Sequence, residues 1–277
     1  TPDYGSGTAS VMLGNGDGSF SARTSFTAGT QPSSVILGDL NRDGILDLAT
    51  SDRGSNTVSV MLGVGNGSFF SRTTFAAGTG ANSITLGDLD DDGSLDLVTT
   101  DVGAGTASVL LGNGDGSFLA RTIFTTGAMP TSVTLGDLNG DGLLDLVNVD
   151  AFSASVSAML GNGDGGFQAR TSFATGSGPS SVALGDLNGD GVLDLVTSDT
   201  FSHKASVLLA TTQTGTAPLL PFSLKTVADA RQTLPMFQQK LDQLSFQRAE
   251  IGVFQSRISV AVNNLQVAAE NFAAAAS

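Results

Sequence analysis

Short apolar runs alternate with glycine-rich turns along most of this 277-residue chain. In one stretch the runs read SSVALGDL, LDLVTSD and KASVLLA, each of strand length and rich in residues that favour strands. The NGDG segments between such runs suit tight hairpins with positive φ. The pattern predicts a mainly β chain of short antiparallel strands that continues to about residue 210.

The runs recur with a period of 49 residues. The segments that mark this period are GDLNRDGILDL, GDLDDDGSLDL, GDLNGDGLLDL and GDLNGDGVLDL. A hairpin-like SVLLGNGDGSF element and an Arg-Thr-x-Phe element keep the same spacing. Four antiparallel strands in each of several repeats predict the blades of a β-propeller. A β-solenoid is the second choice, because solenoid coils usually use fewer residues per turn.

The phase of the repeat predicts where the blades begin and end. Residues 1–13 align with residues 50–62, so the chain enters within one blade and leaves within another near Ala210. We therefore expect three complete blades flanked by two partial ones. Either the N-terminal strands complete the last blade and close a small ring, or further blades precede residue 1. The second option is favoured because propellers usually close with 4–8 blades.

Each repeat contains a loop with oxygen-bearing side chains at alternate positions. In GDLNGDGVLDL, Asp186, Asn188 and Asp190 occupy positions 1, 3 and 5, Gly191 allows a sharp turn, and Asp194 occupies position 9. Position 7 can offer a backbone carbonyl. This set suits Ca²⁺, which accepts 6–8 oxygen ligands, better than the tighter octahedron of Mg²⁺. The loop is not an EF-hand, because position 12 is never Glu and strands are expected on both sides.

The sequence thus predicts four calcium sites. The alternative is an Asp/Asn/Gly turn without metal, but four copies with one ligand spacing, and the repulsion between stacked carboxylates, favour the metal. The expected ligands are Asp39, Asn41, Asp43, Ile45, Asp47, Asp88, Asp90, Asp92, Ser94, Asp96, Asp137, Asn139, Asp141, Leu143, Asp145, Asp186, Asn188, Asp190, Val192 and Asp194.

Charge and composition narrow the range of partners. The formal net charge is −14, and half of the 26 acidic residues are expected metal ligands. Four bound Ca²⁺ ions would bring the charge to about −6, so the acidity belongs mostly to the loops. We expect no nucleic acid partner. The chain has no Cys, and it has no apolar run near the ~20 residues that a membrane span needs.

The DxNxDGxxD loop together with the SVLLGNGDGSF hairpin resembles the FG-GAP, or VCBS-type, calcium-binding repeats over residues 1–210. The resemblance implies a β-propeller whose calcium loops brace the blades, and it does not by itself imply a ligand. Such repeats occur in integrin-like propellers and in bacterial surface proteins. The implied location is therefore extracellular.

Other periodic residues are expected to be structural. The repeated Phe residues should pack between blades, and Arg23, Arg72, Arg121 and Arg170 should lie on the outermost strands, where charge discourages edge pairing. An anion-binding ring is the alternative for the arginines. His203 has no counterpart in the other repeats and is expected at the surface. No nucleophile–base pair can be assembled, so we expect no enzymatic activity.

The composition changes after Ala210. Residues 211–222 are predicted to form a linker, and residues 223–277 a helical region. From Leu234 to Phe272, ten of twelve heptad a/d positions are apolar, which favours an α-helical coiled coil. A long helix packed on its own propeller is the alternative. A coiled coil would provide self-association, either between subunits or with an N-terminal helix.

The C-terminal segment FSLKTVADARQTLPMFQQKLDQLSFQRAEIGVFQSRISVAVNNLQVAAENFAAAAS, residues 222–277, resembles the C-terminal region of bacterial flagellins. The resemblance implies a structural subunit of an extracellular filament, on the bacterial flagellum or cell surface, that displays the propeller. The alternative is a secreted adhesive or lectin-like propeller with an oligomerising tail, whose protein or glycan ligand the sequence does not identify. The absence of Trp and the single Tyr argue against a sugar-binding platform.

Overall fold

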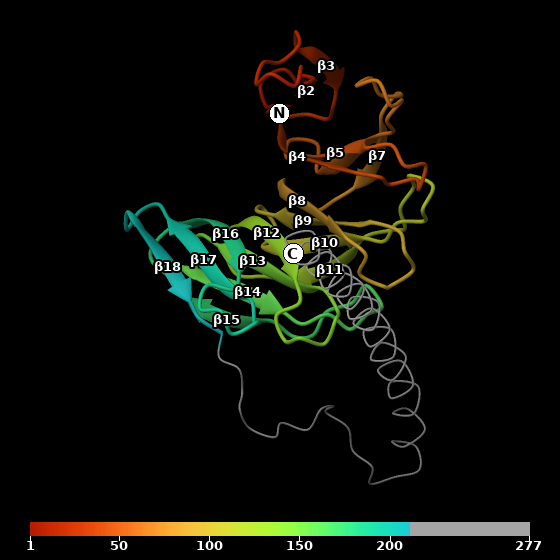
Figure 1. Ribbon diagram of the computed structural model, residues 1–277. Helices are drawn as coiled ribbons and strands as arrows, with labels where there is room; N and C mark the ends of the chain where they lie inside the picture. The colour runs from red at the N-terminus through yellow and green to blue at the C-terminus, as the bar shows by residue number, and fades with distance from the viewer. Residues whose placement is uncertain (211–277) are drawn as a thin grey trace, which may run out of the picture. The chain divides into compact units, whose positions relative to one another are not determined.

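The computed structural model describes residues 1–210, which form five antiparallel sheets joined by turns (Figure 1). The predicted linker, the coiled coil and the flagellin-like region all fall within residues 211–277 and lie outside the described residues. No helix occurs among the described residues, so the prediction of a mainly β repeat region is confirmed.

The three middle sheets contain four strands each, hydrogen-bonded in chain order. Their strands are β4 (Pro32–Gly38), β5 (Asp47–Asp52), β6 (Thr57–Met61) and β7 (Thr73–Ala76); β8 (Ala81–Gly87), β9 (Asp96–Asp101), β10 (Thr106–Leu110) and β11 (Thr122–Thr125); and β12 (Pro130–Gly136), β13 (Asp145–Asp150), β14 (Ser155–Met159) and β15 (Thr171–Ala174).

The first and last sheets contain three strands each. The first has β1 (Pro2–Asp3), β2 (Thr8–Val11) and β3 (Thr24–Thr27), and lacks a counterpart of β4. The last has β16 (Pro179–Gly185), β17 (Asp194–Asp199) and β18 (Lys204–Leu208). The three four-stranded sheets lie where the repeat phase predicted complete blades, and the two three-stranded sheets lie where it predicted partial ones. The two three-stranded sheets are separate, so the N-terminal strands do not complete the last blade in this structure.

Glycines make the tight turns that the NGDG segments predicted. After β10, Gly114 and Gly116 adopt φ values of 72° and 81°, in the left-handed region that a residue with a Cβ rarely enters. These turns let the chain fold back from the third strand and reach the fourth. At the base of the turn, Gly112 and Phe118 form an isolated antiparallel bridge.

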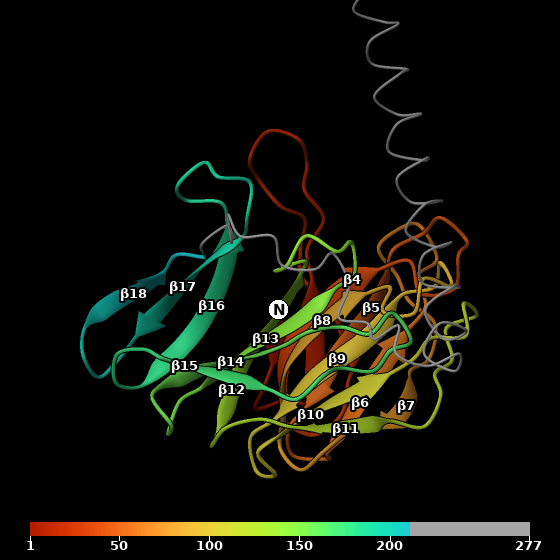
Figure 2. The ribbon, with the colours of Figure 1, turned by 90° about the horizontal axis from the view of Figure 1, so that it is seen from below.

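Neighbouring sheets pack face to face in chain order. The first strands lie next to one another, with β4 beside β8, β8 beside β12 and β12 beside β16, as Figure 2 shows for the middle of the row. Every residue of β5, β9 and β13 is buried, because these strands have a sheet on both sides. Four apolar clusters fill the four spaces between consecutive sheets.

The described residues include no helix with the length and apolar character needed to cross a membrane.

The core of the described region is distributed between the sheets rather than gathered at one centre. Each repeat contributes half of the apolar cluster on either side of it. The loops that join first and second strands contribute leucines such as Leu40 and Leu89 to these clusters, and present polar side chains at other positions.

Candidate metal centre

The predicted metal loops connect the first strand to the second in four of the five sheets. Position 9 of each loop is the first residue of the second strand, namely Asp47, Asp96, Asp145 or Asp194. The glycine at position 6 has positive φ in every loop, 83° at Gly93 for example. The strands on both sides of each loop agree with the exclusion of an EF-hand.

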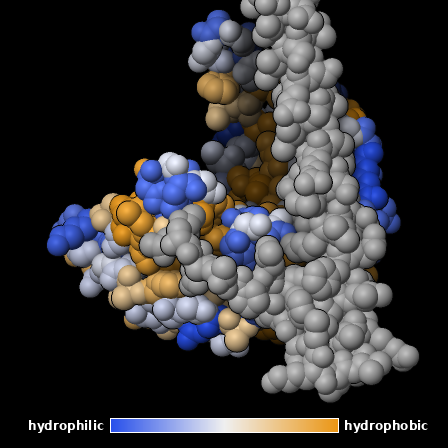
Figure 3. Space-filling model, turned by 60° about the horizontal axis from the view of Figure 1, so that its bottom comes forward, coloured by the Kyte–Doolittle hydropathy of each residue, from blue (hydrophilic) through white to orange (hydrophobic). Residues whose placement is uncertain are grey.

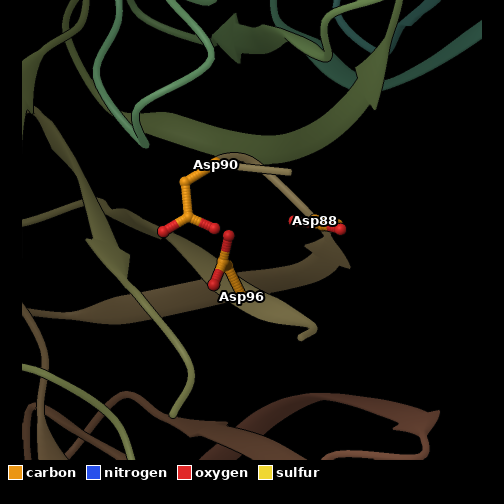
Figure 4. A group of neighbouring side chains, drawn as sticks. All are labelled: Asp88, Asp90 and Asp96. Carbon is orange, nitrogen blue, oxygen red and sulfur yellow. The ribbon is translucent and has the colours of Figure 1, made fainter. Parts of the chain in front are cut away.

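Three carboxylates converge in the second loop, residues 88–96. Asp88, Asp90 and Asp96 each place a carboxylate oxygen within 4.8 Å of the others, and Figure 4 shows Asp90 and Asp96 turned toward one another with Asp88 beside them. Oδ1 of Asp88 and Oδ1 of Asp90 are buried and accept no hydrogen bond. Buried oxygens without a donor are costly. A cation that these oxygens ligate would remove that cost.

The other three loops are arranged differently, because position 3 is Asn instead of Asp. The amide of Asn41 donates to Oδ2 of Asp43 over 2.9 Å, and Asn139 and Asn188 make the same contact with Asp141 and Asp190 over 3.1 Å. Within residues 1–210, a convergence of three carboxylates is therefore found in loop 88–96 alone. The remaining loops offer two carboxylates and an amide oxygen from positions 1, 3 and 5.

Loop backbone groups hold the ligand positions in place. Oδ2 of Asp39 accepts from Gly44 N over 2.8 Å, so the position-1 carboxylate reaches across the turn. Oδ1 of Asp43 accepts from Ile45 N over 2.8 Å, which links positions 5 and 7. Equivalent bonds join Asp92 to Ser94, Asp141 to Leu143 and Asp190 to Val192. Hydrogen bonds from backbone N–H groups to the loop carboxylates therefore hold each loop in its conformation without a bound ion.

The position-9 aspartates have a structural role that the sequence did not reveal. Oδ2 of Asp96 accepts from Leu89 N over 2.7 Å, and Oδ1 accepts from Gly112 N over 2.8 Å, so one carboxylate ties the loop to the hairpin after β10. Asp47, Asp145 and Asp194 make the same pair of bonds. A carboxylate oxygen has more than one lone pair, so these bonds leave it able to ligate a metal.

Burial raises the pKa of Asp96 to about 6. The hydrogen bonds from Gly112 and Leu89 oppose this rise, and repulsion from Asp90 and Asp88 adds to it. Burial also raises the pKa of Asp47 and of Asp145. A proton would therefore compete with any cation at these positions.

An arginine from the preceding repeat reaches loop 88–96. Nη2 of Arg42 donates to the carbonyl oxygen of Asp92 over 2.8 Å and lies 3.3 Å from Oδ1 of the same residue. It also donates to the hydroxyl of Ser94. Hydrogen bonds from Ser94, together with Arg42, lower the pKa of Asp92. The sequence shows only that Arg42 stands at position 4 of the first loop, so this contact between repeats was missed.

A second set of carboxylates, buried within the sheets, was also missed. Asp101 ends β9 and is fully buried; Ser108 Oγ donates to it over 2.6 Å, and Thr99, Thr106 and Gly78 N also donate. Burial raises the pKa of Asp101, and these bonds oppose the rise. Asp52, Asp150 and Asp199 occupy the same place in their sheets. The 49-residue spacing of these aspartates was the available signal.

The periodic arginines extend this network. Nη1 of Arg121 donates to Ser108 Oγ over 3.0 Å, and Arg72 and Arg170 bond Ser59 and Ser157 in the same way. These arginines were expected on the outermost strands, and they lie one residue before the fourth strands β7, β11 and β15. Each links the outermost strand to the hydroxyl that holds the buried aspartate. His203 is exposed, also as expected.

The expected packing of Phe between blades is confirmed for six rings. Phe26 contacts Phe69, Phe75 contacts Phe118 and Phe124 contacts Phe167, with centroids 5.1–5.2 Å apart and edge-to-face geometry. In each pair one ring comes from the last strand of a sheet and the other from the hairpin of the next sheet. Repeated sheets joined by such contacts define a β-propeller-like repeat protein.

The comparisons with known proteins agree with this class. The family model described as FG-GAP-like repeat matches residues 3–50, 45–99, 88–148 and 149–197. The chain belongs to the FG-GAP-like repeat family. No curated protein matches the sequence.

Solved structures with a similar fold are distant in sequence. A protein of unknown function from Desulfotomaculum acetoxidans is 12% identical to this chain, with a TM-score of 0.52. The match covers 73% of this chain and 62% of that protein. A Bacteroides uniformis protein named as a candidate 6-phosphogluconolactonase is 14% identical to this chain, with a TM-score of 0.51. The match covers 72% of this chain and 63% of that protein. This chain spans less than two thirds of either structure. At such identity the likeness shows a shared fold and carries no conclusion about catalysis.

Proposed function

We propose that the four loops bind Ca²⁺ and that the ions brace the blades of a structural, non-enzymatic module. The observation that supports the proposal most directly is the pair of buried, unpartnered oxygens on Asp88 and Asp90, beside Asp96. A divalent ion would neutralise the repulsion among these carboxylates and supply the partner that their oxygens lack.

The residues that would hold the ion are those at positions 1, 3, 5 and 9 of each loop, with the backbone carbonyl of position 7. All of these donors are hard oxygens, the type that Ca²⁺ prefers. Because the position-9 aspartate also bonds the hairpin after the third strand, an ion at the loop would stiffen the junction of three strands. We expect dissociation constants of roughly 10⁻⁴–10⁻³ M, as in other extracellular modules.

A matched pair of variants tests calcium binding at loop 88–96. Asp88→Asn removes a ligand, whereas Asp91→Asn removes the same charge from an exposed position 4 that supplies none. Isothermal titration should show one site fewer for Asp88→Asn and an unchanged number for Asp91→Asn. Calcium should also raise the melting temperature of the unmodified protein relative to chelator, because it binds only the folded state. Equal melting in millimolar calcium and in chelator would overturn the proposal.

We further propose that this module is displayed by a subunit of an extracellular bacterial filament. The support is the flagellin-like sequence of residues 222–277, which could polymerise and leave the blades projecting. Mass spectrometry of filaments sheared from the cells that produce the protein is the test. Recovery of the chain in the filament fraction is expected. Recovery only as soluble secreted protein would instead favour an adhesive propeller with an oligomerising tail.

A further inference from the structure

The four metal loops differ in how many hydrogen bonds their position-1 carboxylate already accepts. Asp137 accepts from three backbone N–H groups of its loop over 2.7–3.1 Å, and Asp186 makes the equivalent three bonds. Asp39 accepts two such bonds. Asp88 accepts one, from Gly93 N over 2.9 Å, and its Oδ1 accepts none. Loop 88–96 is therefore the loop whose position-1 carboxylate is least satisfied by its own backbone.

Position 3 shows the same contrast. Oδ1 of Asn139 accepts from the backbone N–H of Asp141 over 3.0 Å, and its amide donates to the carboxylate of the same residue over 3.1 Å. Asn41 and Asn188 make the same pair of bonds. Oδ1 of Asp90, in contrast, is buried and accepts no bond. Three loops thus engage both the oxygen and the nitrogen of position 3 without an ion, whereas loop 88–96 leaves a carboxylate oxygen unpaired.

Loop 88–96 also carries more negative charge than the others. Five of its nine residues are acidic, against three in each other loop, and the additional two are Asp90 and Asp91. Arg42 places one positive charge beside Asp92, which offsets only one of the two. The affinity of an oxygen site for Ca²⁺ depends on the number of its charged ligands. Charge and unsatisfied oxygens therefore favour the same loop.

The cost of the ion-free state also differs between the loops. In loops 39–47, 137–145 and 186–194, an ion must compete with hydrogen bonds that the ligand oxygens already accept. In loop 88–96 it meets two buried oxygens without a donor, and such oxygens cost free energy until a partner arrives. Repulsion among Asp88, Asp90 and Asp96, whose oxygens lie within 4.8 Å of one another, adds to this cost. An ion relieves both costs at once.

We propose that the loops form two classes: loop 88–96 binds Ca²⁺ first and most tightly, and the other three fill only at higher calcium concentration. The inference rests on the proposed function, because it ranks the same four sites. Each loop takes its ligands from its own sheet, so one site can fill without the others. The hydrophilic surface visible in Figure 3 is likewise divided into separate patches. The stability of the blades then rises in two steps as calcium increases.

The first ion braces the middle of the row of sheets. The carbonyl oxygen of Leu89, at position 2 of loop 88–96, accepts from Gly165 N over 3.1 Å, and Gly165 belongs to the hairpin of the next sheet. Leu111 lies over that glycine, because a β-carbon there would stand 2.6 Å from Leu111 Cδ2. Leu62 and Gly116 have the same relation one repeat earlier. An ion in loop 88–96 therefore strengthens the junction between the sheets β8–β11 and β12–β15.

The position-6 glycines provide one reporter for each loop. Their N–H groups donate to the position-1 aspartates, so each amide signal responds to the ion in its own loop; the reporters are Gly44, Gly93, Gly142 and Gly191. Calcium is titrated into the nitrogen-15-labelled full chain at about pH 7.5, where the carboxylates are charged, and the signals are followed by nuclear magnetic resonance. Gly93 should reach the midpoint of its shift at a calcium concentration roughly tenfold lower than the other three.

Two reciprocal substitutions test whether position 3 is the cause. Asp90→Asn gives loop 88–96 the side chain of the other loops, and should raise the midpoint of Gly93 roughly tenfold. Asn139→Asp gives loop 137–145 a third carboxylate, and should lower the midpoint of Gly142 roughly threefold. The second effect is smaller because Asp137 keeps its three backbone donors.

Asp91→Asn is the matched control, because it removes the same charge from an exposed position 4 and should move the midpoint of Gly93 less than about twofold. Circular dichroism in chelator checks that every variant folds. Four glycines that titrate at one concentration, or a Gly93 midpoint that Asp90→Asn leaves unchanged, would overturn the ranking while calcium binding stands. If no glycine responds in millimolar calcium, the proposed function itself is wrong, and this inference with it.

Discussion

Gly127 lies against the carboxylate of Asp150, so closely that a β-carbon on the glycine would stand 2.5 Å from Asp150 Cγ. Gly127 N donates to Asp150 Oδ1 over 2.9 Å, which explains the approach. Gly29, Gly78 and Gly176 have the same relation to Asp52, Asp101 and Asp199. The glycine before each first strand therefore makes room for the buried carboxylate of the following sheet.

Gly127→Ala should destabilise the repeat region by about 1–3 kcal/mol, because the added carbon must push a fully buried carboxylate away from its donors. The measurement is urea-induced unfolding followed by circular dichroism. Gly14→Ala is the control, since nothing lies within 4 Å of its β-carbon position and its φ is not in the left-handed region. If the two substitutions cost the same free energy of unfolding, close approach to Asp150 is not the cause.

Ser108→Ala should cost about 1–3 kcal/mol, because it removes the shortest hydrogen bond to the buried Asp101 and leaves that oxygen with a weaker set of donors. It also removes the acceptor of Arg121. The free energy of unfolding reports the loss. Ser117→Ala deletes a hydroxyl bonded to the exposed Asp115, where water can replace it, and should cost less than about 0.5 kcal/mol. A comparable loss in both variants would contradict the role assigned to burial.

Stability without calcium should rise as the pH falls from above 6 toward 4. The pKa of Asp96 is about 6 in the folded protein and 3.8 in the reference state, so the folded state binds the additional proton in this window. Stability is therefore gained as pH decreases, by at most about 3 kcal/mol at this residue. Thermal melting in chelator between pH 4 and pH 7 measures the trend. A melting temperature that falls steadily as the pH drops from 7 to 4 would contradict it.

Stabilisation by calcium should show the opposite dependence on pH. Ligation needs the charged form of Asp96, so the proton competes below about pH 6. The difference in melting temperature between calcium and chelator should shrink as the pH falls from 7 to 5. Asp47 and Asp145, whose pKa values are also raised by burial, should contribute in the same direction.

Arg42→Gln should tighten calcium binding at loop 88–96 by roughly threefold, because it removes a positive charge that neighbours the site and is only partly screened by water. The stability of the protein in chelator should change by less than about 1 kcal/mol, since the ion pair with Asp92 is exposed. Arg53→Gln removes an exposed arginine from a turn that carries no loop ligand and is the control. Equal affinity in both variants would mean that Arg42 does not influence the site.

The strands, the turns and the packing of the Phe rings could be predicted because the same residue types recur at the same positions in every repeat. Asp186 and Asn188, for example, stand two positions apart in one loop, so spacing alone brings them together. Arg42 and Asp92 are separated by 50 residues and meet only because neighbouring sheets stack, which spacing within one repeat cannot show.

The difference between the loops was harder to foresee. The sequence predicted four equivalent sites, yet Asp90 stands where the other loops have an Asn whose amide donates to the position-5 aspartate, and three carboxylates converge in loop 88–96. The position-9 aspartates were predicted as ligands only. Their two backbone bonds became visible once the hairpin was placed next to the loop.

The identical spacing of the contacts between sheets has a consequence for how this gene can change. Leu62 meets Gly116, and one period later Leu111 meets Gly165, so excising exactly 49 residues between equivalent positions rejoins the same partner types. Insertion or deletion of one whole repeat in the gene would have this effect. A deletion of any other length would place each leucine opposite a residue other than its glycine. Relatives that still fold should therefore differ from this chain by whole numbers of repeats.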